Sequence, residues 1–278
     1  MKLLQQLGFV TTLPDNALLV NGVVIKCDYN NTGKPLFEAM KKLQSVPETI
    51  VYANAEAIKI HPSKGARKEI TPTAKGTPNV YIINITSQQA YDRMLLTFDP
   101  NRPIAILNFA NAAQLGSSAL FQTTPQEQGL MHKFPPVFAS YLHYMETHKK
   151  RDGKYLVGNE IAVTEISPHV FMLAGAMPDL TTRSAPTEDE YVAKIKNLIE
   201  IAAALGITQL ILGAWGCGVF GNKPETVAAA FKKAIDETNV EMTITFAVPG
   251  SQDDGSIYQI FQKELEAKNY LTKANEPA

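Results

Sequence analysis

Glycines are concentrated in the stretch LGAWGCGVFGN, residues 212–222, between an apolar run typical of a buried strand and a helix expected to begin at Pro224. Glycine lets several backbone N–H groups turn toward one anion, and a helix N-terminus favours negative charge. Proline in the first turn suits a helix that starts directly after this loop. The stretch therefore indicates a diphosphate-binding loop, although glycine-rich turns also occur for tight packing alone. It contains neither GxxxxGK(S/T) nor GxGxxG, so Walker-type and Rossmann-type phosphate sites are disfavoured.

Amide and carboxylate side chains follow a second apolar run in LNFANAAQLGSSALFQTTPQEQGL, residues 107–130. Asn108 and Asn111 are expected at the C-terminal end of a strand, where amides suit the hydroxyls of a ribose. Glu127 is expected at the start of a helix, where a carboxylate could transfer protons. The alternative is that both asparagines satisfy turn backbone and that Glu127 is an ordinary helix N-terminal charge. Taken alone, this stretch favours the alternative.

Together the two stretches resemble the microbial poly(ADP-ribose) glycohydrolase family, a branch of the macrodomain fold. The similarity covers most of the chain from residue 79 onward. Its most specific part is GAWGCGVFGN with the helix motif VAxxF at 227–231, and LNFAxA at 107–112 is the second match. Ala185-Pro186 before a long helix also looks like the family's middle region. The resemblance implies an α/β fold, a three-layer α/β/α macrodomain with a mixed, mostly parallel central sheet.

The resemblance also implies which residues bind the ligand. The family's phosphate-binding loop falls on Gly216, Cys217, Gly218, Val219, Phe220 and Gly221, with Phe220 against the distal ribose. The family position that contacts that ribose through an asparagine falls on Gln114. The other predicted ligand-binding residues are Asn108, Asn111, Gly116, Ser117 and Gln126.

Two departures from the family pattern bear on catalysis. The family's Asn-Pro-Gly-Gly-Gly becomes QLGSS at 114–118, and serine approaches a diphosphate less freely because it carries a Cβ. The family's Gln-Glu-Glu becomes Gln126, Glu127 and Gln128. An amide at the last position cannot protonate a leaving group at neutral pH. Glu127 remains, and a carboxylate beside a ribose C1″ can stabilise an oxocarbenium-like state.

The predicted function is therefore an ADP-ribose-recognising glycohydrolase that removes ADP-ribose from modified proteins, with Glu127 as the catalytic residue. Loss of the tri-glycine loop favours mono-ADP-ribosyl groups over polymer. The expected partner is ADP-ribose or an ADP-ribosylated protein, and neither a cofactor nor a metal is expected. Two alternatives stay open. One is a reader that binds ADP-ribose without cleaving it, for which Gln128 is the best argument, and the other is a protein-interaction scaffold.

Other chemically suggestive residues have ordinary explanations. Trp215 inside the glycine-rich stretch is more typical of a packing anchor than of an adenine stacker. Cys217 has no His or Asp partner implied by spacing, so a nucleophilic thiol is disfavoured. The reserve candidates for proton transfer are Asp179, Asp253, Asp254 and His132.

The elements that must position these residues alternate between short β-rich runs and helical segments, which is the pattern of a layered α/β sheet. Strands are predicted at 79–86, 103–109, 170–175, 209–214 and 242–248. Helices are predicted at 88–98 after an N-cap at Ser87, at 135–148, after a capping box of Thr187 and Glu190, at 224–237 and at 257–267. Gly206 can end the helix that follows Thr187.

The first 75 residues are less regular. We expect a strand pair over 17–27 turning at Asn21-Gly22, a helix near 35–43, a strand at 49–53 and an exposed polar loop at 61–77. The chain is therefore divided into an N-terminal extension packed on the core, 1–75, and a macrodomain, 76–278.

Composition excludes several classes of protein. The 278 residues include 26 basic and 27 acidic side chains, a formal charge of −1, which argues against duplex-DNA binding. With no run of 18 apolar residues and no signal-peptide pattern at the start, we expect no membrane association and a cytoplasmic location; export without a cleaved signal stays open. Two cysteines cannot form a disulfide framework, and the five histidines lack metal-binding spacings. The oligomeric state is not indicated.

Overall fold

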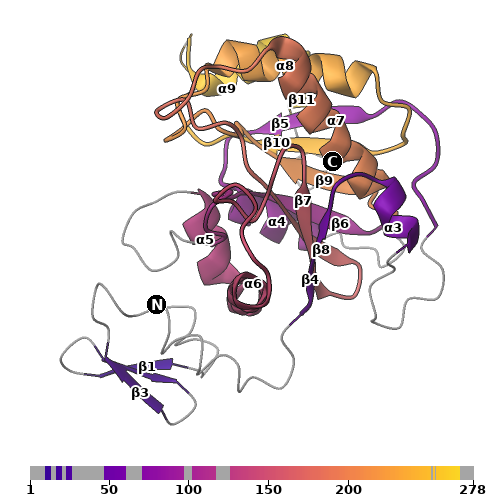
Figure 1. The fold of residues 1–278 in the computed structure, drawn as a ribbon. Helices are drawn as coiled ribbons and strands as arrows, with labels where there is room; N and C mark the ends of the chain where they lie inside the picture. The colour runs from indigo at the N-terminus through magenta and orange to yellow at the C-terminus, as the bar shows by residue number, and fades with distance from the viewer. Residues whose placement is uncertain are drawn as a thin grey trace.

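The computed structural model describes residues 10–13, 17–20, 23–26, 47–60, 71–96, 102–116, 126–251, 253 and 255–269 (Figure 1). The predictions for the turn at 21–22, the helix at 35–43 and most of the loop at 61–77 lie outside these residues. Ser117 and Asp254 lie outside them as well, as does the side chain of His132.

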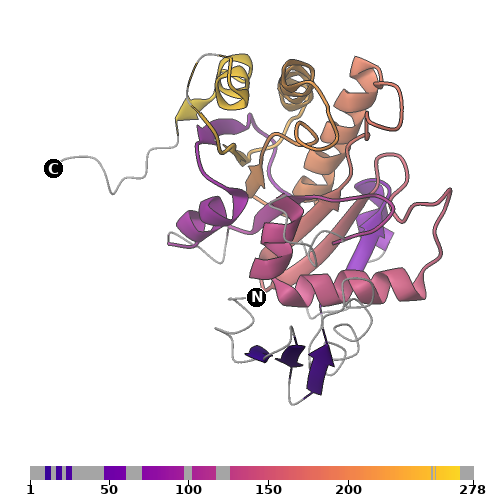
Figure 2. The ribbon, with the colours of Figure 1, turned by 90° about the vertical axis from the view of Figure 1, so that its left-hand side faces the viewer.

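An eight-stranded sheet in the order β11-β5-β10-β9-β6-β8-β7-β4 forms the centre of the molecule (Figures 1 and 2). Within this described sheet, β7 pairs antiparallel with both of its neighbours, and every other pair is parallel. The sheet is therefore mixed and mostly parallel, as predicted. Its strands are β4 (Thr49–Tyr52), β5 (Asn79–Ile83), β6 (Ile104–Phe109), β7 (Ile161–Ser167), β8 (Val170–Gly175), β9 (Gln209–Leu212), β10 (Thr243–Ala247) and β11 (Lys268–Asn269).

Helices cover both faces of the sheet. One face packs against α3 (Glu56–Ile60), α7 (Glu188–Ala204), α8 (Pro224–Asp236) and α9 (Ile257–Glu264) through a core that includes Leu198, Phe231 and Phe261. The other face packs against α4 (Ser87–Leu95), α5 (Gln126–Lys133) and α6 (Pro135–Thr147). Figure 1 shows α8 and α9 on the side of the sheet opposite to α5 and α6. The predicted three-layer α/β/α architecture is confirmed.

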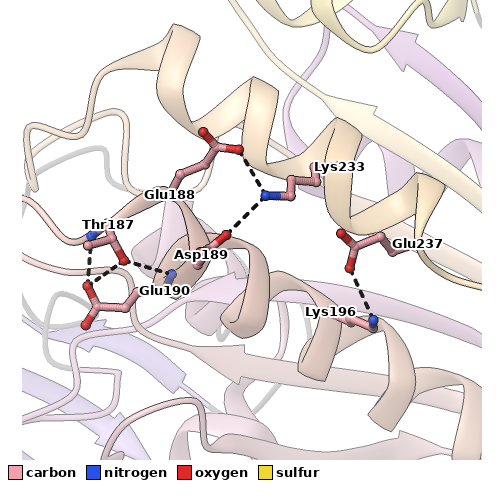
Figure 3. A network of polar contacts seen from close by, with 7 residues as sticks. All are labelled: Thr187, Glu188, Asp189, Glu190, Lys196, Lys233 and Glu237. Carbon is pink, nitrogen blue, oxygen red and sulfur yellow. Dashed lines mark hydrogen bonds and ion pairs between the residues drawn. The ribbon is translucent and has the colours of Figure 1, made fainter.

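Helix boundaries follow capping chemistry. The capping box at the start of α7 is present, because Thr187 accepts from the Glu190 N–H while the Glu190 carboxylate accepts from Thr187 (Figure 3). Gly206 ends this helix with a φ of 70°. The predicted N-cap of α4 is wrong by one residue. Thr86 caps the helix by exchanging two hydrogen bonds with Gln89, and Ser87 begins it.

The region before residue 75 contributes to two sheets. β1 (Val10–Leu13), β2 (Ala17–Val20) and β3 (Val23–Lys26) form a separate antiparallel sheet, which contains the predicted strand pair. β4 instead forms an edge of the central sheet, and α3 buries Ile58 in the core. The division at residue 75 stays a prediction. Within the described ranges, no helix combines the length and the apolarity needed to cross a membrane.

Candidate functional site

A pocket of about 750 Å³ opens beyond the C-terminal ends of β6, β9 and β10. Parallel α/β sheets bind ligands at this edge, because the loops that connect strands to helices gather there. Both stretches singled out in the sequence line the pocket. The stretch at 107–130 supplies Gln126, Glu127 and Gln128, and the stretch at 212–222 supplies Gly216, Cys217, Gly218, Val219 and Phe220.

The glycine loop, residues 216–221, follows β9 and ends just before α8. Gly216 has a φ of 82°, and a Cβ there would lie 2.7 Å from the Met177 Cβ, so only glycine fits. The N–H groups of Gly218, Val219 and Phe220 donate to no acceptor among the described residues. A Cβ on Gly218 would have no neighbour within 4 Å. The loop therefore presents three successive N–H groups beside open space, which is the arrangement of an anion-binding loop.

Asn222, which the sequence analysis did not single out, holds the glycine loop in this shape. It is buried, and its Nδ2 donates to the carbonyl oxygens of Gly216 at 3.0 Å and Pro178 at 2.8 Å. Its Oδ1 accepts from the hydroxyl of Tyr191 on α7. Because both ends of the amide are bonded, the loop is coupled to α7 and to the segment after β8.

Trp215, just before the glycine loop, and Cys217, within it, have the roles that the sequence analysis favoured. Trp215 is buried beneath the loop, and its Nε1 donates to the Gly175 carbonyl at 3.2 Å, so the prediction of a packing anchor is confirmed. Burial, together with the Glu225 carboxylate, raises the pKa of the Cys217 thiol to about 12. The thiol is therefore protonated near neutral pH, which disfavours a nucleophilic role.

Glu127 lies in the first turn of α5 with 4% of its surface exposed. Its Oε1 accepts from the Gly116 N–H at 2.9 Å and from the Asn108 Nδ2 at 3.2 Å. Such hydrogen bonds are strong when the acceptor is ionised, and the helix N-terminus also favours negative charge. These contacts fix a carboxylate in the wall of the pocket.

Gly116 has a backbone reason to be glycine. Its φ is 69°, and a Cβ would lie 2.8 Å from the Phe138 ring. The single glycine of the QLGSS segment at 114–118 thus directs an N–H at Glu127. Asn108 is fully buried, does not line the pocket and also bonds to Glu127. In the structure both residues contact the carboxylate, and their predicted contacts with ligand stay predictions.

The remaining amides differ in their surroundings. Asn111 accepts from the Ala113 N–H at 2.9 Å, the turn contact that was the alternative from sequence, and Gln114 is exposed. Neither lines the pocket, so their ribose contacts stay predictions. Gln126 accepts from the Phe109 N–H at 2.9 Å and donates to the Leu107 carbonyl at 2.6 Å, so its side chain extends the hydrogen bonding of β6.

The reserve aspartates lie elsewhere. Asp179 accepts from the backbone and hydroxyl of Thr181 at 3.0 and 2.6 Å, and Asp253 is exposed beside Ser251. Neither lines the pocket. Both form local turn contacts, as the ordinary explanation predicted.

No protein-family model matches this sequence, and no curated protein matches it. The fold of this chain does match those of solved structures. Poly(ADP-ribose) glycohydrolase from Deinococcus radiodurans in complex with ADP-ribose has a TM-score of 0.54 and 20% identity, covering 83% of this chain and 97% of that chain. The enzyme from Thermomonospora curvata bound to the inhibitor ADP-HPD has a TM-score of 0.55 and 19% identity, covering 94% and 95%. The family resemblance read from the sequence is thus matched by the fold, and this chain has the macrodomain-like fold of bacterial poly(ADP-ribose) glycohydrolases.

Proposed function

We propose that this chain is an ADP-ribosyl glycohydrolase that recognises ADP-ribose and removes it from modified proteins. One observation carries the proposal. The N–H groups of the glycine loop that have no acceptor among the described residues line the same pocket as the Glu127 carboxylate, and its volume of about 750 Å³ is in the range of small-molecule sites. The structural neighbours crystallised with ADP-ribose support the choice of ligand.

In the proposed complex, the diphosphate accepts hydrogen bonds from the N–H groups of Gly218, Val219 and Phe220. Phe220 is half-buried at the pocket wall, and it packs against the distal ribose. The site then binds its ligand mainly through backbone donors and apolar contact.

Glu127 is the group proposed to act on the reacting bond. The water oxygen attacks C1″, the bond from C1″ to the leaving oxygen breaks with its electron pair, and Glu127 accepts a proton from water. The negative charge also stabilises the oxocarbenium character of the transition state. Gly116 and Asn108 keep the carboxylate at the pocket wall throughout this step.

Gln128 narrows the class of substrate. This residue lines the pocket where the family has its proton donor, and an amide donates no proton to a leaving group. An aspartyl or glutamyl ester leaves as a carboxylate, whose conjugate acid has a pKa of about 4, and needs no protonation. A ribose or seryl oxygen leaves as an alkoxide unless it is protonated. Mono-ADP-ribose on acidic side chains is therefore the substrate class that this site favours.

The test is release of free ADP-ribose from defined linkages. We expect the fastest release from glutamate-linked mono-ADP-ribose and slower release from serine- and arginine-linked substrates and from polymer. Absence of release from all four at high enzyme concentration refutes hydrolysis.

A non-catalytic reader is the second candidate, and Gln128 is the observation that favours it. Calorimetry with free ADP-ribose separates both candidates from a scaffold without nucleotide binding. A reader binds ADP-ribose, releases none from any linkage and is indifferent to the charge of Glu127. A scaffold shows no heat of binding at millimolar ligand.

A further inference from the structure

A second pocket, of about 390 Å³, lies at the N-terminal half of α7 and shares no lining residue with the pocket described above. We call it the α7 pocket. Its lining includes Gly158, Asn159, Pro178, Arg183, Tyr191 and Lys194. The volume is large enough for a small organic ligand rather than a single ion.

Lys194 is the buried cation of the α7 pocket. Only 8% of its surface is exposed, and its Nζ donates to the Gly158 carbonyl. An ammonium group has three donors, and Lys194 forms no ion pair with any described residue. Burial and, to a smaller extent, the Arg183 charge lower the pKa of this ammonium to about 8. A buried charge without a counter-ion is costly, so an anion would be favoured beside it.

Arg183 places a second positive charge at the same pocket. It is exposed, and it forms neither a hydrogen bond nor an ion pair within the part of the chain that the structure describes. Its charge acts on both Lys194 and Tyr191, which line the pocket with it. The guanidinium is thus free to fold over a bound anion and to bind it through two donors.

The nearby carboxylates are engaged elsewhere. Glu160 accepts from both terminal nitrogens of Arg151 at 2.6 Å. Asp189 and Glu190 border the α7 pocket, but Figure 3 shows Asp189 directed toward Lys233 of α8 and Glu190 folded back onto Thr187. The charge of Glu160 still acts on Lys194 and that of Glu190 on Arg183, but among the described residues no carboxylate forms an ion pair with either cation.

The turn at residues 158–159, which lines the α7 pocket, is held in place. Asn197, one turn further along α7, donates through its Nδ2 to the carbonyls of Asn159 at 2.8 Å and Ala53 at 3.0 Å. The turn that contains Gly158 is therefore attached to the helix that carries Lys194. A ligand would meet a preformed pocket.

We propose that the α7 pocket is a binding site for a phosphate group, with Lys194 as the buried contact and Arg183 as the contact at the rim. The site is separate from the pocket proposed to bind ADP-ribose and goes beyond that function. Inorganic phosphates and nucleotide phosphates present the same chemistry, so the experiment includes both.

The experiment follows backbone amide signals by NMR while the full chain, with saturating ADP-ribose present, is titrated with inorganic pyrophosphate or, separately, with AMP. We expect shifts at residues 158–159 and 193–194 in at least one titration, and about tenfold weaker binding in Lys194→Met. Lys196→Met is the matched control on the same helix and should bind as the wild type does, because Lys196 pairs with Glu237 outside the α7 pocket (Figure 3).

Shifts in the pyrophosphate titration alone identify a free phosphate site, and shifts with AMP identify a nucleotide site. Shifts confined to residues 216–221, or equal affinity in Lys194→Met and wild type, overturn the proposal. If Lys194→Met does not fold, Arg183→Gln serves instead, since that side chain is exposed. Unchanged binding in a folded Arg183→Gln would then count against the site.

Discussion

The glycine loop and the segment around Glu127 line the same pocket but differ in how their polar groups are used. In the glycine loop, three successive N–H groups donate to no described acceptor. Around Glu127, the Gly116 N–H and the Asn108 amide are both bonded to the carboxylate. The first region leaves its backbone donors open, whereas the second uses its donors to hold one of its own side chains. Binding and turnover should therefore respond to different substitutions.

The largest effect is expected from Glu127→Gln. The variant keeps the shape of the side chain but removes the charge, so hydrolysis should fall by about 10³-fold while ADP-ribose affinity stays within a few-fold of wild type. Turnover of a glutamate-linked substrate and calorimetry with ADP-ribose measure the two effects. Asp253→Asn is the control, because Asp253 is exposed and is not a lining residue of the pocket. If Glu127→Gln kept full activity, Glu127 would not be the group that transfers the proton, and the reserve aspartates would be the next candidates.

Gly218→Val tests the other region. Its Cβ meets no atom within 4 Å in the free protein, so folding should be unaffected, whereas a bound diphosphate would meet the new side chain. We expect ADP-ribose affinity to fall by about 10- to 100-fold with little change in the midpoint of thermal unfolding.

Gly216→Ala provides the contrasting control. Its positive φ and the 2.7 Å approach to Met177 predict a loss of stability by about 1–3 kcal/mol. Unchanged affinity in Gly218→Val would contradict the assignment of the diphosphate to this loop.

Gln128→Glu sharpens the comparison by placing a second carboxyl group next to Glu127 in the pocket lining. A carboxylic acid there can protonate an alcohol leaving group, so release from polymer or serine-linked substrate should rise by about tenfold or more. Release from a glutamate-linked substrate should change little, because that leaving group needs no proton. The ratio of the two rates is the measurement, and equal changes in both would remove leaving-group protonation as the basis of specificity.

Much of the architecture was predictable because it follows from local patterns. The apolar run of β6 indicated a strand covered on both faces, and the capping box marked the start of α7. It was also predictable that the stretches at 107–130 and 212–222 line one pocket, since strand ends in a parallel sheet meet at one edge. β7 was not predicted. Its buried half and half-exposed end give neither a continuous apolar run nor a regular alternation.

The roles of particular side chains depended on contacts between distant residues. Asn108 meets Glu127, and Tyr191 meets Asn222, across 19 and 31 positions respectively. No periodicity predicts such pairs, because the pairing is set by how the helices pack on the sheet. Lys194 was missed for the same reason. Its Nζ bonds to the carbonyl of Gly158, 36 positions away.

The smallest effect is expected from Tyr191→Phe. It removes the hydroxyl that donates to Asn222 and keeps the packing of the ring, so the glycine loop loses one buried hydrogen bond of about 1 kcal/mol. We expect ADP-ribose affinity to fall about fivefold. AMP, which lacks the diphosphate, should lose less. Tyr155→Phe is the matched control, since its hydroxyl bonds to the Met145 carbonyl and Tyr155 does not line the pocket. An equal loss for both ligands would mean that Asn222 and Tyr191 support the fold in general and do not set the position of the N–H groups proposed to bind the diphosphate.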